Sequence, residues 1–247
     1  MHTLFISDLH LHESRPQITR AFFQLLQTQT KDLEALYILG DFFDAWIGDD
    51  DDALLNAQVA GELKKLSARG TRLFLMHGNR DFLIGNQFAT QAGARLIAEG
   101  TLINLYGTPT LLLHGDSLCT GDLDYMKFRH QVRSAQWQQQ ILAQPLSTRR
   151  ALAAQMREKS QTMNSLKADD ILDVTPSEVI RVMQEAGVTR LIHGHTHRPA
   201  RHALQVKGVP AERIVLGDWH ELAWAIHASQ HKLELIHWNI DNILPID

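Results

Sequence analysis

Five short apolar runs of this chain each end in side chains that bind metal ions well. The runs cover residues 3–7, 35–39, 72–76, 111–113 and 190–192 and have the length and composition of buried strands. Residues 16–28 and 53–68, between the first three runs, have the periodicity of helices, and this alternation indicates an α/β architecture. Ligands of open α/β sheets bind at the carboxyl ends of the strands. We therefore expect the residues after these runs to meet at one edge and form the functional site.

The side chains at these strand ends belong to aspartate, asparagine and histidine. They lie in the motifs Asp8-Leu9-His10, Gly40-Asp41, Gly78-Asn79, His114 and Gly194-His195-Thr196-His197. The i, i+2 spacing in the first and last motifs directs both members of a pair to one side of an extended backbone. Mixed oxygen and nitrogen donors suit Mn²⁺, Fe²⁺ or Zn²⁺, and of these ions Mn²⁺ best tolerates a ligand set that is rich in oxygen. Two ions about 3.5–4 Å apart clamp a phosphoryl group, and Asp41 is the best candidate for a ligand shared between them.

Residues 122–173 differ from the rest of the chain, because they carry no strand pattern and read as helices broken near Pro145. The window from Lys127 to Lys167 holds eight basic residues and one acid, Glu158, so its net charge is +7 and that of the remainder is −11. We expect a core of residues 1–121 and 174–247, with antiparallel strands near 213–216, 222–226 and 233–236. A cationic helical cap is expected as an insertion at 122–173.

The ordered motifs DLH, GDFFD, GNRD, HGD and GHTH together resemble the calcineurin-like metallophosphoesterase family, over most of the chain outside the insertion. The resemblance implies an α/β fold, a four-layer αββα sandwich, here with the helical insertion as a cap. It also implies a dinuclear metal site. One metal would be held by Asp8, His10, Asp41 and His197, and the other by Asp41, Asn79, His114 and His195.

The third motif departs from a common pattern of that family, in which a histidine follows the asparagine and helps to protonate the leaving oxygen. Here Arg80 follows Asn79. Arginine keeps its proton at any relevant pH and cannot act as a general acid. Its planar guanidinium group can, however, donate two hydrogen bonds to an anionic phosphate. This favours a leaving group that needs no proton, such as the phosphate released from a pyrophosphate. The alternative is that another group supplies the proton.

Longer runs at residues 37–51, 77–83, 114–122 and 191–199 resemble a narrower branch of the family, the pyrophosphatases of lipid A biosynthesis in Gram-negative bacteria. This resemblance spans nearly the whole chain. It implies cleavage of a lipid-linked UDP-sugar, UDP-2,3-diacylglucosamine, to UMP and 2,3-diacylglucosamine 1-phosphate by attack of metal-bound hydroxide at the α-phosphorus. The implied catalytic residues are Asp41, Asn79, Arg80 and His195.

The same resemblance gives the insertion a role in binding the lipid. The implied contacts to the substrate are Asn79, Arg80, Asp122, Tyr125, Phe128, Arg157, Ser160, Asn164, Lys167 and His195. An acyl groove would be lined by Phe128, Val132, Trp137, Leu152, Met156 and Ile171. The alternative for these apolar residues is packing of the insertion onto the core. The one-sided charge favours an anionic substrate or lipid surface over a solvated helix face.

Other readings stay open at this point. A different dinuclear phosphodiesterase or nucleotide pyrophosphatase of the same fold is the first alternative, and a noncatalytic scaffold that binds a protein partner is the second. No basic stripe with interleaved aromatic residues supports nucleic-acid binding, and no obligate protein partner is expected. Residues 49–52, four aspartates, read as an exposed loop. The sequence has a single cysteine, Cys119, and shows neither a signal peptide nor a long apolar run. We therefore expect a cytoplasmic enzyme at the periphery of the inner membrane.

Overall fold

Two β-sheets form the centre of the protein in the computed structural model, which describes residues 1–28, 31–165 and 173–246, with only the backbone described for 159–165. The six-stranded sheet has the order β11-β10-β1-β2-β3-β4 and the five-stranded sheet the order β5-β6-β7-β9-β8. The strands of the first are β1 (His2–Ile6), β2 (Leu33–Leu39), β3 (Arg72–Met76), β4 (Ala94–Ile97), β10 (Leu222–Ser229) and β11 (Leu233–Asn239). Those of the second are β5 (Thr101–Leu105), β6 (Thr108–Leu112), β7 (Arg190–His193), β8 (Ala200–Val206) and β9 (Val209–Val215).

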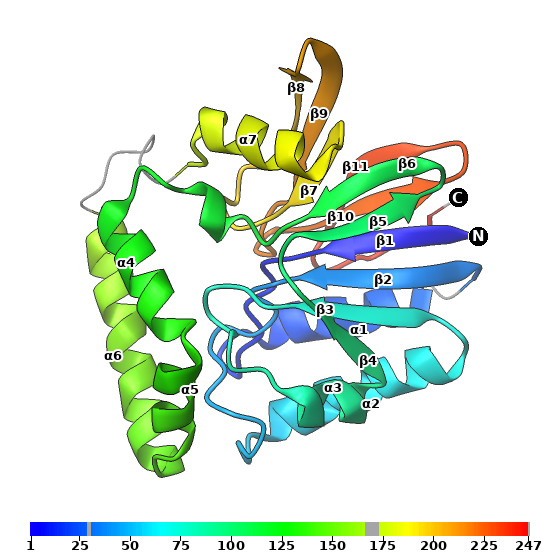
Figure 1. Cartoon of the computed structure of the whole chain (residues 1–247). Coiled ribbons are helices and arrows are strands. Elements are labelled where there is room, and N and C mark those ends of the chain that lie inside the picture. Colours follow the sequence, from blue (N-terminus) through cyan, green and yellow to red (C-terminus); the bar gives the residue numbers. More distant parts are fainter. Residues whose placement is uncertain (29–30, 166–172, 247) are drawn as a thin grey trace.

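Helices cover the outer face of each sheet, so that the layers follow the order helix, sheet, sheet, helix (Figure 1). The helices α1 (Pro16–Thr28), α2 (Leu54–Ala68) and α3 (Asn86–Ala92) lie on the six-stranded sheet, and α7 (Pro176–Ala186) lies on the five-stranded one. The expected αββα sandwich is therefore confirmed.

Alternation along the strands produces this layering, since successive side chains of a strand point to opposite faces. In β1, Leu4 and Ile6 join the core beneath α1 and α2, whereas Phe5 joins the core between the two sheets. In β6 and the residue after it, Leu111 and Leu113 pack toward α7 and the residue between them faces the other sheet. β1 and the buried end of β6 are thus apolar on both faces, which explains why they read as continuous apolar runs.

The C-terminal strands pair largely as expected. β10 is antiparallel to both β1 and β11, and β8 is antiparallel to β9. β9 also pairs with β7 in parallel, which differs from the expected antiparallel arrangement. The expectation that all five site-bearing strands end at one edge of a single sheet was wrong. β1, β2 and β3 lie in one sheet, whereas β6 and β7 lie in the other.

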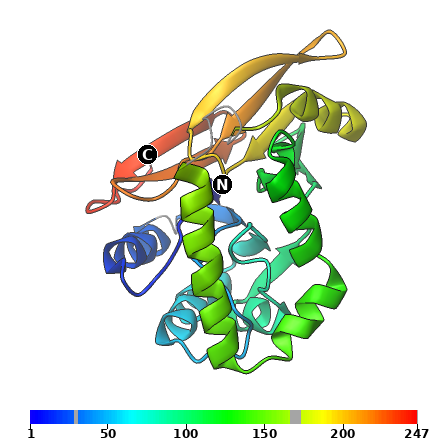
Figure 2. The same cartoon turned by 90° about the vertical axis from the view of Figure 1, so that its left-hand side faces the viewer.

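Residues 123–165 form three helices that stand beside the sandwich, α4 (Leu123–Val132), α5 (Ala135–Leu142) and α6 (Leu146–Ser165). α4 and α5 run down one side and α6 returns as a long separate helix (Figure 2). Side chains of Asp122 and Ser134 cap α4 and α5 by accepting from backbone N–H groups, and Pro145 precedes α6. The carboxyl ends of β1 and β2 point toward these helices (Figure 1). No helix among the described residues is long and apolar enough to cross a bilayer.

Candidate active site

Three predicted metal ligands converge at the end of β1 and after β7. His197 Nε2 lies 3.3 Å from His10 Nε2 and 3.5 Å from Asp8 Oδ1. One donor atom from each of the three residues falls within 4.8 Å of the other two. This separation lets a single cation contact all three side chains.

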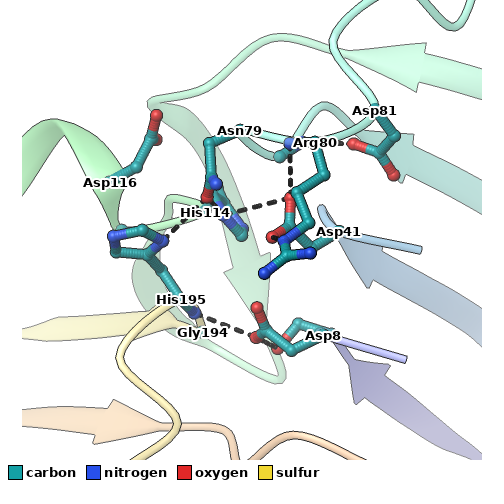
Figure 3. A network of polar contacts seen from close by, with 12 residues as sticks. Asp8, Asp41, Asn79, Arg80, Asp81, His114, Asp116, Gly194 and His195 are labelled. Carbon is teal, nitrogen blue, oxygen red and sulfur yellow. Dashed lines mark hydrogen bonds and ion pairs between the residues drawn. The ribbon is translucent and has the colours of Figure 1, made fainter. Parts of the chain in front are cut away.

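A second group of the same kind contains Asp8, Asp41 and His114. Asn79 adjoins it, because its Oδ1 lies 2.9 Å from His114 Nε2 and 2.8 Å from His195 Nδ1. All seven predicted ligands therefore meet in one place, five of which Figure 3 labels.

The residue common to both compact groups is Asp8. Asp41 nevertheless lies between the groups, with its carboxylate 3.8 Å from His10 Nδ1 and 3.7 Å from His114 Nε2. The expectation that Asp41 is the shared ligand stays a prediction.

The backbone at these ligands is left-handed and not extended, which corrects the reasoning from i, i+2 spacing. Asp8, His10, Asp41, His195 and His197 all have φ between 49° and 69°. Aspartate and histidine tolerate this region better than β-branched residues, but it is still sparsely populated and clusters at functional sites. The left-handed residues turn the chain after β1, β2 and β7, the three strands that they follow.

Glycines allow the loops to approach one another closely. A Cβ on Gly78 would lie 2.1 Å from Asp41 N, and one on Gly194 would lie 2.2 Å from Asp8 Oδ2. No side chain fits at either position without moving a predicted ligand, so glycine is required there for steric reasons.

Burial perturbs the acid–base properties of the site. Burial raises the pKa of Asp41 to about 7, assisted by the negative charges of Asp81 and Asp8. Burial alone would lower the pKa of His114, but the nearby carboxylates, Asp41 first, raise it to about 9. Burial lowers the pKa of His195 to about 4, so this imidazole is neutral and keeps a lone pair at neutral pH. A buried cluster of carboxylates with these shifts favours an added cation.

Unsatisfied atoms provide a separate test of whether a cation fits. Asp8 Oδ1 and His10 Nδ1 are buried and accept or donate no hydrogen bond. Buried polar atoms without a partner are costly and rare in folded proteins, and an ion is one of the ordinary explanations. The carboxylate and imidazole donors are also those that divalent transition metals bind. The residues present therefore fit a metal centre.

Arg80 lies beside this centre and is held by two carboxylates. Its backbone N–H donates to Asp41 Oδ1 at 2.9 Å, and its Nη1 donates to Asp44 Oδ1 at 2.9 Å. The other oxygen of Asp44 pairs with Arg157 of α6. Two of the cationic side chains predicted to bind the substrate thus meet at one buried aspartate, which sequence reasoning did not single out.

The remaining predicted substrate contacts lie in the helices beside the site. The ring of Tyr125 stacks against His195 at 6.2 Å, and Phe128 is 38% exposed on the same helix. Asp122 is buried and caps α4. Ser160 and Asn164 lie on α6, but their side chains fall outside the described residues, as does the whole of Lys167.

The apolar residues expected in an acyl groove largely pack onto the core instead. Val132 is buried in the core beneath α1 and α2, and Trp137 and Met156 pack against that core. Leu152 is partly buried, and Ile171 falls outside the described residues. Among the members of the set that the structure describes, Phe128 is the one that stays exposed.

The positive charge of the helices is mostly matched by acidic residues of the sandwich. Arg129 pairs with Asp116 and Glu99, and Arg150 pairs with Asp51 and Asp52. The three other described arginines of these helices also pair with aspartates: Arg133 with Asp116, Arg149 with Asp50 and Arg157 with Asp44. The uneven distribution of charge in the sequence therefore holds two parts of one molecule together, and most of the described arginines are not free to face a membrane.

The four consecutive aspartates form a loop in which Asp50 and Asp52 are exposed, as predicted, but the loop also makes specific contacts. Asp49 accepts from the backbone N–H groups of Gly85 and Phe88 and so caps α3. Asp50 pairs with Arg149, and the next two aspartates pair with Arg150.

A groove of about 590 Å³ runs between this loop and α6. Its lining includes Phe43, Leu55, Ala154 and Arg157, and of these Arg157 also pairs with Asp44. The sequence contained no signal for this groove, because its two sides are more than 90 residues apart.

Comparison with known proteins agrees with this architecture. The family model described as calcineurin-like phosphoesterase matches residues 1–199. A UDP-2,3-diacylglucosamine hydrolase of Cellvibrio japonicus is 68% identical over 240 residues, which cover 97% of this chain and 100% of the relative.

Relatives with the same name are found in other bacteria. The protein from Marinobacter nauticus is 53% identical, covering 94% of this chain and 95% of that one. The protein from Pseudomonas aeruginosa is 52% identical, covering 94% and 98% respectively. The chain therefore belongs to the calcineurin-like phosphoesterase family.

Proposed function

We propose that this protein hydrolyses the pyrophosphate bond of UDP-2,3-diacylglucosamine, releasing UMP and 2,3-diacylglucosamine 1-phosphate, as a step of lipid A biosynthesis. The main observation in support is the convergence of seven predicted metal ligands beside Arg80, in a chain similar along nearly its full length to hydrolases of that name. The reaction transfers the uridylyl group, through its α-phosphorus, to water, for which such a constellation is suited.

Two divalent ions, with Mn²⁺ the best match to the donors, are the proposed cofactor. Asp8, His10, Asp41 and His197 would hold one, and Asp41, Asn79, His114 and His195 the other. When bound, such ions lower the pKa of water and neutralise charge on phosphoryl oxygens. Asp81 supports the arrangement, since its carboxylate accepts from the backbone N–H groups of Phe42 and Gly78, each at 2.7 Å.

Arg80 is proposed to bind the phosphate of the departing group. Its side chain is 29% exposed beside Asp41, so it is accessible to solvent while still oriented by Asp44. Because it carries a permanent charge, it stabilises an anionic leaving group without transferring a proton. A phosphate leaving group meets this condition, whereas an alkoxide does not.

The helices α4–α6 are proposed as a cap that binds the lipid half of the substrate, with residues 122–173 as an insertion in a core of 1–121 and 174–247. Tyr125 stacks against the predicted ligand His195, the ring of Phe128 lies 6.5 Å from that of Tyr125, and Arg157 pairs with Asp44. An exposed Leu123, 69% accessible, adds apolar surface at the start of α4. A substrate with two acyl chains resides in a membrane, and we propose that the enzyme works at the inner leaflet as a peripheral protein.

A product assay tests the function. Purified protein stripped of metal and reloaded with Mn²⁺ is expected to convert UDP-2,3-diacylglucosamine to UMP, and the metal-free protein is not. Efficient cleavage of a water-soluble nucleotide pyrophosphate, with none of the diacylated substrate, would favour the alternative enzyme of the same fold.

A further inference from the structure

Asp116 is fully buried two residues after the predicted ligand His114, yet it belongs to neither of the compact groups of metal-binding side chains. Its carboxylate points away from Asp8 and Asp41 (Figure 3). One oxygen, Oδ2, accepts from Tyr125 Oη at 2.6 Å and from Arg129 Nε at 2.8 Å. Arg133 Nη2 lies 3.7 Å from the same oxygen. All three partners come from α4 or the residue that ends it.

One of these partners reaches the site through His195. The ring of Tyr125 lies at 27° to that imidazole, with 6.2 Å between the centroids, and His195 Nδ1 lies 2.8 Å from Asn79 Oδ1. The hydroxyl bond to Asp116 fixes the ring of Tyr125, and the stacked ring limits the orientation of His195. Burial and the charge of Asp116 raise the pKa of Tyr125 well above its usual range, so the phenol remains a donor.

Another partner reaches the site through the loop that carries Asn79 and Arg80. Arg133 Nη2 donates to the carbonyl oxygen of Gly78 at 2.8 Å, and its guanidinium lies over the ring of Phe82 at 5.4 Å. The charge of Asp116 therefore helps to hold an arginine that braces the backbone directly before Asn79. A single carboxylate acts on two different parts of the site through one helix.

We infer that Asp116 is a positioning residue: it fixes α4 against the predicted metal centre so that His195 and the Gly78–Arg80 loop keep the geometry that turnover requires. The inference rests on the proposed function, because turnover of the diacylated substrate is one of its measurements. Displacements of an ångström at a reacting centre reduce rates about a hundredfold. An effect on kcat with little change in metal content is therefore the expected consequence.

The test compares Asp116→Asn with Glu99→Gln in the full chain loaded with Mn²⁺. Glu99 pairs with Arg129, as Asp116 does, but among its described contacts it has none with Tyr125 or Arg133, so its substitution is a matched control. Well below the unfolding midpoint, Asp116→Asn is expected to lower kcat roughly ten- to a hundredfold with KM within about threefold. Glu99→Gln is expected to leave both near the wild-type values. Equal kinetics of Asp116→Asn and the wild type would overturn the inference, because a merely structural role affects unfolding alone.

A second variant covers the case in which Asp116→Asn does not fold. Tyr125→Phe removes the hydroxyl but keeps the stacked ring, and it is expected to lower kcat in the same direction. If both variants fold, their effects on kcat should be less than additive, because they interrupt the same connection. Strictly additive effects, or wild-type turnover by both, would count against the assignment.

A spectroscopic measurement separates this inference from the proposed function. In protein loaded with Co²⁺, the visible absorption bands report the arrangement of ligands around the ion. Asp116→Asn is expected to shift these bands and Glu99→Gln is not, whatever substrate the wild-type enzyme cleaves. Wild-type protein that fails to cleave the diacylated substrate would refute the function alone, whereas unchanged bands would refute the role of Asp116.

Discussion

Arg149 of α6 forms a bidentate ion pair with Asp50, in which Nη1 and Nη2 donate to the two carboxylate oxygens at 2.7 and 2.5 Å. The same guanidinium donates to the carbonyl oxygens of Ile47 and Gln144, and the side chain is 4% exposed. The N-terminal part of α6 is thereby fastened to the loop after β2. Gly48 lies beside it with φ 134°, a backbone conformation that L side chains rarely adopt, and a Cβ there would lie 2.3 Å from Arg149 Nη1.

Replacing Arg149 with methionine is expected to destabilise the protein by about 1–3 kcal/mol, because two carbonyl groups and one carboxylate lose a donor. The expected loss is modest because Asp50 itself is 61% exposed to solvent. Urea unfolding gives the free energy. Arg150→Met is the control, since Arg150 pairs with two aspartates from an exposed position and should matter much less. Equal losses in the two variants would contradict this view of Arg149.

The pair also illustrates what the sequence could not reveal. Arg149 and Asp50 are 99 residues apart, and neither periodicity nor composition connects them. The sequence shows the excess of positive charge in residues 127–167. It does not show whether these charges are paired, because an unpaired cationic surface and a set of ion pairs have the same composition. Only the fold decides that the acidic loop at 49–52 faces α6.

Local patterns predicted the strands that carry the site, since β1, β2, β3, β6 and β7 are largely buried and apolar with predicted metal ligands after them. The missed elements have weaker patterns. α3 has seven residues, too few for a helical period to be recognised, and β5 and β8 alternate without a long apolar run. α7 was within reach, because Pro176 at its first turn and Gly187 after its end are ordinary helix signals.

Asp41→Ala is expected to abolish turnover, because the carboxylate lies 3.8 Å from His10 and 3.7 Å from His114 and so adjoins both groups of predicted ligands. Metal content measured by elemental analysis should fall together with activity. Full metal loading in an inactive variant would show that Asp41 acts on the substrate alone.

Arg80→Ala is expected to give a different result, with kcat/KM reduced roughly 10²–10³-fold and metal content near that of the wild type, as for loss of one preorganised donor in an active site. Arg80→Lys keeps the charge but not the fork and should recover part of the activity. Loss of metal together with loss of activity would argue against a role in binding the substrate.

Cys119 is expected to be chemically inert in the folded protein. The thiol is buried, and burial raises its pKa to about 12, assisted by the charges of Asp116 and Asp173. Since thiolate is the reactive form, a disulfide reagent at pH 8 should react far more slowly with native protein than with protein unfolded in guanidinium. Cys119→Ala should retain turnover. Rapid labelling of the native protein would contradict the burial of this side chain.

Acid sensitivity is expected from the contact between His2 on β1 and His227 on β10, whose rings lie 5.0 Å apart. Burial lowers the pKa of both, and for His2 the charges of His227 and the N-terminus lower it further, against an opposing effect of Asp32. Near His227, Glu234 raises the pKa and Lys232 lowers it.

A histidine whose pKa is lower in the folded than in the unfolded state binds fewer protons when folded, so its contribution to stability is present above about pH 6.5 and is lost as the pH falls below that value. The free energy of unfolding should therefore decrease between pH 7.5 and 5.5, and His227→Gln should make the decrease smaller. His231→Gln, at an exposed position, is the control and should keep the wild-type slope. Urea unfolding at the two pH values measures the difference, and an unchanged slope in His227→Gln would show that this pair does not contribute.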